Sequence, residues 1–98
     1  MSDLTLEISK DFTFDAAHHF GHKEADHPFS RLHGHSFAGT VTLRGRPAAD
    51  SGMVRDFWEI EAEIEKIRDQ LDHRLLNDVD GLEHPSLEAI AAWVFERL

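Results

Sequence analysis

Two stretches of alternating residues constrain the fold of this chain most strongly. From residue 4 to residue 18, the even positions are mostly apolar and end in a histidine, whereas the odd positions are mostly polar. Residues 33 to 44 repeat the pattern, with two histidines, Phe37, Val41 and Leu43 on one parity. A period of two predicts half-buried β-strands. The polar loop between them is too short for a helical crossover, so we expect the strands to pair antiparallel.

Two amphipathic helices are predicted after the strands. Asp56 suits an N-cap, with Glu59 at the capping-box position. The expected buried stripe has helical spacing and consists of Phe57, Ile60, Ile64, Ile67 and Leu71. The charged residues of the opposite face are interpreted as solvated; they are Glu61, Glu65, Lys66 and Arg68. Ser86 can cap a second helix. Its predicted apolar stripe is Leu87, Ile90, Ala91 and Val94, with Trp93 off the stripe, facing either another subunit or the core edge.

The short chain and its charge limit the possible partners. With 98 residues, a single α+β domain over 1–98 is expected. The formal net charge of −9 argues against nucleic acid and against an anionic membrane surface. No cysteine is present, which excludes a thiolate nucleophile. There is no signal-peptide pattern and no apolar stretch near the ~18 residues that cross a bilayer, so a cytoplasmic protein is expected.

Histidines cluster in the first half of the chain. Six of the eight lie in one stretch and are His18, His19, His22, His27, His33 and His35. His33 and His35 project from the same face of a strand, and the antiparallel pairing brings His18 beside them. Three imidazoles with an open fourth position are typical of a catalytic zinc site. The alternative is that these are surface histidines of a polar loop.

Five short motifs resemble the 6-pyruvoyl-tetrahydropterin synthase family, including its branch that makes 6-carboxy-tetrahydropterin for queuosine. They occur in the family's order and spacing and cover nearly the whole chain. The motifs are FDAAH at 14–18, LHGHSF at 32–37, GMVRDF at 52–57, LDHRLLND at 71–78 and PSLE at 85–88.

The resemblance implies a tunnelling fold, in which an antiparallel sheet backed by two helices closes into a barrel through oligomerisation, with a hexamer as the family expectation. It implies Zn²⁺ on His18, His33 and His35, and a 7,8-dihydroneopterin triphosphate substrate at a subunit interface. Asp72 and His73 match the family's acid–base pair. Ser86 matches a position near the substrate, and Glu88 of the same motif is a further candidate for substrate binding.

The sequence departs from the family in two places. The family's catalytic cysteine falls at Phe29, which cannot transfer a proton. Glu24, Asp26 and His27 of the same loop are possible substitutes, with Glu24 as our assignment; each can equally be a solvated loop residue. Family members also continue with two more strands that carry a pterin-anchoring glutamate, so we expect this chain to be truncated after Leu98.

Three hypotheses follow for the function. The first is a zinc-dependent lyase that converts dihydroneopterin triphosphate to a tetrahydropterin, the 6-carboxy product being favoured over the 6-pyruvoyl product. The second is a non-catalytic, zinc-bearing pterin-binding homologue, which Phe29 favours. The third is a metal-stabilised oligomer without a small-molecule role.

Overall fold

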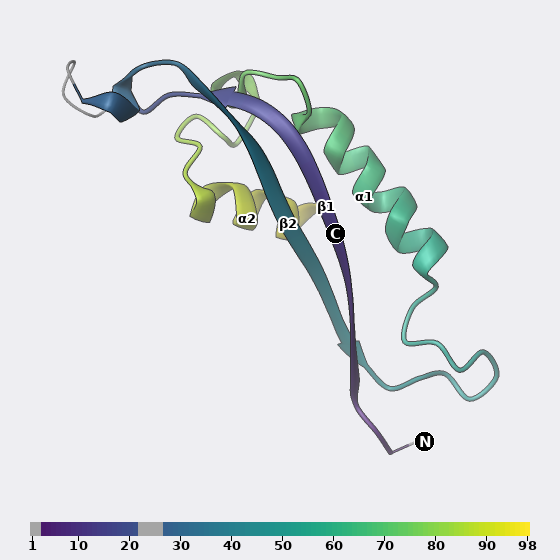
Figure 1. Cartoon of the computed structure of the whole chain (residues 1–98). Helices are drawn as coiled ribbons and strands as arrows, with labels where there is room; N and C mark the ends of the chain where they lie inside the picture. Colours follow the sequence, from purple (N-terminus) through teal and green to yellow (C-terminus); the bar gives the residue numbers. More distant parts are fainter. Residues whose placement is uncertain (1–2, 22–26) are drawn as a thin grey trace.

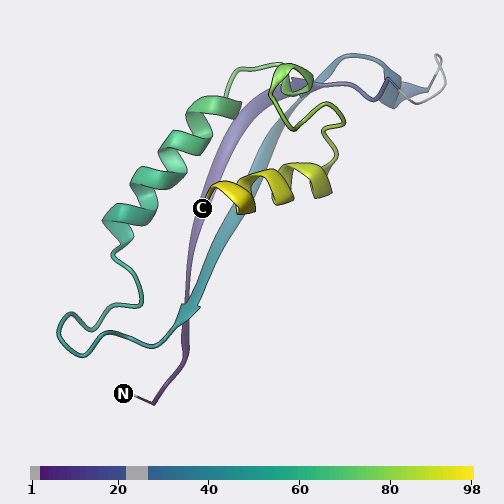
Figure 2. The ribbon, with the colours of Figure 1, turned by 180° about the vertical axis from the view of Figure 1, so that it is seen from behind.

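The structure is a computed structural model that describes residues 3–21 and 27–98. A long hairpin of β1 (Leu6–His18) and β2 (His33–Gly45) is followed by α1 (Phe57–Leu71) and α2 (Leu87–Arg97). Two short 3₁₀ turns, Pro28–Ser30 and Leu76–Asp78, lie in the connections. Both helices lie on the same side of the curved strands (Figures 1 and 2). The predicted α+β class, with an antiparallel sheet backed by two helices, is confirmed.

The hairpin is in the register that the alternation requires. β1 and β2 pair antiparallel from Leu6 opposite Gly45 to His18 opposite His33. Because side chains alternate between faces, the even residues of β1 and the odd residues of β2 share one face. Phe14 and Phe37 meet there with ring centroids 5.0 Å apart, and both are buried. The apolar parity is therefore the one that the helices cover.

The core lies between that face and the helices. Ile67 and Leu71 of α1 and Ile90 and Val94 of α2 join the two phenylalanines in one buried cluster. A smaller cluster towards the start of α1 consists of Val41, Ile60 and Ile64. Burying such side chains contributes roughly 1.5–3 kcal/mol each. The core anchors both helices near the half of the hairpin that carries the histidines.

The start of α1 differs from the prediction in two ways. Asp56 is the N-cap, because its carboxylate accepts a hydrogen bond from the backbone N–H of Trp58 at 2.8 Å. Glu59, however, accepts a hydrogen bond from Nε of Arg55 at 2.9 Å, a partner other than the N-cap amide of the expected capping box. Phe57 is 41% exposed, so the predicted stripe begins one turn too early.

The buried face of α2 is rotated relative to the predicted stripe. Ser86 caps the helix by accepting a hydrogen bond from Ala89 N at 3.1 Å, as expected. Leu87 is 67% exposed and Ala91 is also exposed, whereas Trp93 is only 4% exposed. The core-edge alternative for Trp93 is confirmed, because its Nε1 donates to the carbonyl of Asp80 at 2.9 Å. That bond to the preceding loop draws the indole inwards.

The segment after α1 runs parallel to the end of β1 and hydrogen-bonds to its free edge. His73 N donates to the carbonyl of Asp15 at 2.6 Å, and Ala17 N donates to the carbonyl of Arg74 at 3.0 Å. His73 has a left-handed backbone with φ of 58°, which is uncommon for a residue other than glycine. The turn lets the chain leave α1 and run directly beside β1. Barrel closure by oligomerisation and the single domain over 1–98 stay predictions.

In the described residues, no helix combines the length and apolar character that crossing a bilayer requires.

Candidate metal centre and acid–base pair

The three predicted metal ligands converge at one end of the hairpin. His18 and His33 face each other across the strands, and His35 lies two residues further along β2. Their ring centroids are 4.6 Å apart for His18 and His33, 5.1 Å for His18 and His35, and 4.8 Å for His33 and His35. One ring nitrogen from each residue lies within 4.8 Å of the others. This group could hold a metal ion.

Backbone carbonyls orient two of the three rings. Nδ1 of His18 donates to the carbonyl of Pro85 at 2.9 Å, and Nδ1 of His33 donates to the carbonyl of Arg31 at 2.7 Å. A carbonyl only accepts hydrogen bonds, so in the neutral form of either ring the proton lies on Nδ1 and Nε2 carries a lone pair. Metal-binding histidines usually have their tautomer fixed in this way, because the ring nitrogen that does not bind the metal donates to a carbonyl or carboxylate.

The His18 side chain gives the strongest indication that this group suits a metal ion. His18 is 5% exposed, and among the described residues its Nε2 is buried with no hydrogen-bond partner. Burial lowers the pKa of His18, and the nearby His33 and His35 lower it further, although the bond to Pro85 acts in the opposite direction. The ring is therefore neutral at neutral pH. A buried lone pair without a partner costs about 1–3 kcal/mol, which a bound cation would offset. The residues present thus fit a metal.

An open cavity borders the histidine group. Its volume is about 750 Å³, within the range of small-molecule sites. All three histidines line it, and Ser86 and Glu88 at the start of α2 line it too. The structure therefore brings both predicted substrate-binding residues to the metal group. Their contact with a substrate stays a prediction.

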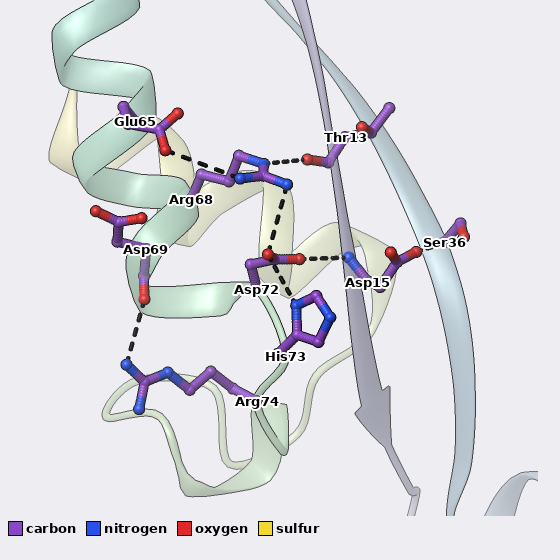
Figure 3. A network of polar contacts seen from close by, with 9 residues as sticks. All are labelled: Thr13, Asp15, Ser36, Glu65, Arg68, Asp69, Asp72, His73 and Arg74. Carbon is purple, nitrogen blue, oxygen red and sulfur yellow. Dashed lines mark hydrogen bonds and ion pairs between the residues drawn. The ribbon is translucent and has the colours of Figure 1, made fainter.

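Asp72 and His73 form the predicted pair, and His73 borders a cavity other than the one that all three histidines line. Oδ2 of Asp72 lies 2.9 Å from Nδ1 of His73 (Figure 3). The backbone N–H of Asp15 is the main cause that lowers the pKa of Asp72, followed by the hydrogen bond to His73, with a smaller contribution from the charge of Arg68. A second cavity of about 670 Å³ contains His73, and its lining shares His35 and Ser36 with the first. Asp72 is an ionised partner for the exposed imidazole.

The proposed replacements for the missing cysteine are only partly placed. Glu24 and Asp26 lie outside the described residues, so both stay predictions. His27 is half-buried, and its carbonyl accepts hydrogen bonds from Ser30 N at 2.9 Å and Ser30 Oγ at 2.8 Å. The backbone of Phe29 belongs to the Pro28–Ser30 turn.

Sequence reasoning missed several residues that support the site. Arg68, predicted to be solvated, reaches the strand edge and Asp72. Asn77 holds the chain just beyond β1 through both ends of its side-chain amide. Its Oδ1 accepts from His19 N at 3.1 Å, and its Nδ2 donates to the carbonyl of His19 at 3.0 Å. The spacing of Arg68 four residues before Asp72 was a usable signal. No sequence pattern pointed to the contact between Asn77 and His19, because the partner atoms are backbone.

Together, the hairpin and the site define a class of protein: an α+β scaffold with a cavity at the strand ends, lined by three histidines that could hold a metal. The sequence profile of 6-pyruvoyl tetrahydropterin synthase matches residues 7–98. A 6-carboxy-5,6,7,8-tetrahydropterin synthase of Synechocystis is 44% identical over 93% of this chain and 73% of its own length. A dihydroneopterin monophosphate aldolase of Pyrococcus furiosus is 35% identical over 88% of this chain and 68% of its own length.

Solved structures show the same fold. The 6-pyruvoyl tetrahydropterin synthase of Caenorhabditis elegans superposes with a TM-score of 0.86 and 25% identity, covering 99% of this chain and 79% of that one. The chain belongs to the 6-pyruvoyl tetrahydropterin synthase family and is an enzyme of the pterin synthase type.

Proposed function

We propose that this protein is a zinc-dependent, lyase-type pterin synthase that converts 7,8-dihydroneopterin triphosphate to a 6-substituted tetrahydropterin. The convergence of three histidines beside an open cavity is the observation that carries the proposal. The Synechocystis relative, named a 6-carboxy-5,6,7,8-tetrahydropterin synthase, favours the 6-carboxy product over the 6-pyruvoyl product.

Zinc is the metal that the donor set favours. Three neutral imidazoles suit zinc and are poor ligands for magnesium or calcium. His18, His33 and His35 would hold the ion through one ring nitrogen each. When bound, zinc supplies a Lewis acid that polarises oxygen atoms of the substrate side chain and acidifies the neighbouring carbon. The open cavity beside the three histidines leaves room for the substrate side chain.

Ser86 and Glu88 are the proposed substrate-binding residues of the cavity that the three histidines line. Both line it together with the histidines. The Ser86 oxygen accepts the helix-capping hydrogen bond from Ala89, which leaves its O–H free to donate to a ligand. The exposed Glu88 carboxylate accepts only, so it suits the N–H groups of a pterin ring.

The Asp72–His73 pair is the proposed proton-transfer unit. The ionised carboxylate orients the ring through Nδ1, so Nε2 is the atom that takes or gives the proton. His73 borders a cavity other than the one with all three histidines. We therefore propose that the active site is completed in a homo-oligomer, where the Asp72–His73 pair of one subunit lies at the interface with the next. Glu24 is the proposed base in place of the cysteine.

Two other activities are candidates for specific reasons. The 35% identical relative named dihydroneopterin monophosphate aldolase favours carbon–carbon cleavage of a dihydroneopterin phosphate. Phe29, at the position of the family's cysteine, favours a zinc-bearing homologue that binds pterin without turnover. Both use the same histidine site and differ only in the chemistry that follows binding.

Product identification separates the three. The zinc-loaded protein is incubated with 7,8-dihydroneopterin triphosphate and, separately, with the monophosphate, and the pterins are identified by liquid chromatography and mass spectrometry. A 6-carboxy-tetrahydropterin product supports the proposal. Cleavage of the monophosphate alone would contradict the synthase proposal and support the aldolase activity instead. Bound, unchanged pterin would indicate the binding homologue. His35→Ala is the matched control, since it removes an exposed ligand and should abolish turnover.

A further inference from the structure

The outer edge of β1 beside Asp72 has its backbone groups taken up by one segment of chain. The carbonyl of Thr13 accepts from Nε of Arg68 at 2.7 Å, and Asp15 N donates to Oδ1 of Asp72 at 2.9 Å. The Asp15 carbonyl accepts from His73 N at 2.6 Å. An edge strand exposes such groups unless something covers them. Here two of the three bonds use side chains, Arg68 and Asp72.

Arg68 joins this edge to the acid–base pair. While its Nε binds the strand, Nη2 lies 3.4 Å from Oδ2 of Asp72, the same oxygen that contacts His73. Figure 3 shows the guanidinium between the Thr13 carbonyl and the Asp72 carboxylate, with His73 beyond. Its Nη1 faces Glu65 at 3.8 Å. The backbone adds a further link, since Asp72 N donates to the Arg68 carbonyl at 2.7 Å.

We propose that Arg68 is a positioning residue, which fixes the Asp72 carboxylate so that Oδ2 holds Nδ1 of His73 and leaves Nε2 for the reaction. This inference rests on the role proposed above for the Asp72–His73 pair. Arg68 lines neither the cavity of the three histidines nor the cavity of His73, so we assign it no contact with a substrate. It acts through Asp72.

The chemistry of the guanidinium explains why arginine serves here. Its planar fork presents donors in fixed directions, so one side chain binds a carbonyl and a carboxylate at once. A lysine at this position keeps the positive charge but has a single ammonium that cannot reproduce both directions. Around Asp72, the charged or titratable neighbours are Arg68 and Glu65 from α1, His73 after it, and Asp15 from β1. The Asp15 carboxylate is itself engaged by the Ser36 hydroxyl at 2.5 Å.

A double-mutant cycle tests the proposal by turnover. Arg68→Met, Arg68→Lys, Asp72→Asn and Arg68→Met/Asp72→Asn are compared with wild type on 7,8-dihydroneopterin triphosphate. We expect Arg68→Met to lower kcat at least tenfold, with KM and zinc content within twofold, and Arg68→Lys to fall between. In the Asp72→Asn background, Arg68→Met should change kcat less than twofold. An equal factor in both backgrounds would overturn the proposal, because the two residues would act independently.

A second measurement needs no turnover. The Asp72 carboxyl is titrated by carbon-13 NMR in wild type, Arg68→Met and the control Arg55→Met, which loses an ion pair at the other end of α1. Removing the cation beside Asp72 should raise its pKa and shift the Asp15 amide resonance, whereas Arg55→Met should change neither. Identical titrations and amide shifts in all three proteins would overturn the positioning role.

The two measurements separate the two proposals. If the wild-type protein leaves every pterin unchanged while the Asp72 pKa still depends on Arg68, the function proposed above is wrong. The positioning of Asp72 by Arg68 is then supported on its own. If the protein turns over pterin but the cycle and the titration show no coupling, Arg68 is only a surface ion-pair residue. Should Arg68→Met fail to fold, Arg68→Gln carries both tests, since it removes the charge beside Asp72 but keeps a polar side chain.

Discussion

His18→Leu should separate the cost of the buried imidazole from the benefit of the metal. In wild type without metal, Nε2 of His18 is buried and has no partner among the described residues, at a cost of about 1–3 kcal/mol. Leucine removes that atom but leaves the buried Pro85 carbonyl without its donor, which costs about the same. The apolar neighbours Phe20 and Phe37 still have a side chain to pack against. In chelator, the variant should therefore lie within about 1 kcal/mol of wild type.

Zinc should then distinguish the two proteins. A ligand that binds only the folded state, present at a hundred times its Kd, stabilises by about 2.7 kcal/mol. For a domain of this size, 1 kcal/mol shifts Tm by roughly 4–8 °C, so wild type should gain about 10–20 °C and His18→Leu almost nothing. Differential scanning calorimetry with chelator and with zinc measures both values.

The neighbouring His19→Leu is the matched control and should keep the zinc-dependent shift. His19 lies next to His18 in the chain but outside the three-histidine group. The reasoning fails if zinc stabilises His18→Leu as much as wild type. It also fails if His18→Leu loses several kcal/mol in chelator, because the unpartnered Nε2 would then not be a cost in the apo fold.

Three further predictions follow from single residues. His35 is exposed, so His35→Ala should change stability in chelator by less than ~0.5 kcal/mol yet lose bound zinc, as atomic absorption would show; full zinc content would contradict the ligand assignment. The Asp15 N–H, His73 and Arg68 lower the pKa of Asp72, so its contribution to stability is complete above the unfolded pKa of about 3.9 and is lost as pH falls through the lower folded pKa. Asp72→Asn should thus flatten the pH dependence of urea unfolding below about pH 4, and an unchanged slope would count against the network. Gly81→Ala should cost about 1–3 kcal/mol in thermal unfolding, because φ is 90° and the new Cβ would lie 3.1 Å from Cδ1 of Trp93; Gly52→Ala, with φ of 71° and no neighbour within 4 Å, isolates the backbone part of that cost.

The local pattern of the sequence determined the hairpin, its pairing and the meeting of three histidines. Alternation assigns each residue to a face, and a short connection allows only antiparallel pairing, so the position of His18 beside His33 followed without coordinates. The caps Asp56 and Ser86 were predictable for the same reason: a cap is a bond between near neighbours in the chain. Such features depend on interactions within a few residues or on the period of a strand.

The tertiary structure alone decided which side of each helix is buried and what supports the site. Trp93 turned inwards because its indole N–H reaches the carbonyl of Asp80, and Leu87 was left exposed. Arg68 looked like one charge of a solvated face until the fold placed it against Thr13 and Asp72. Its partner on β1 is a backbone carbonyl 55 residues away in the sequence, and every residue type carries that group. No residue pattern marks such a partner, so only the packed chain can reveal it.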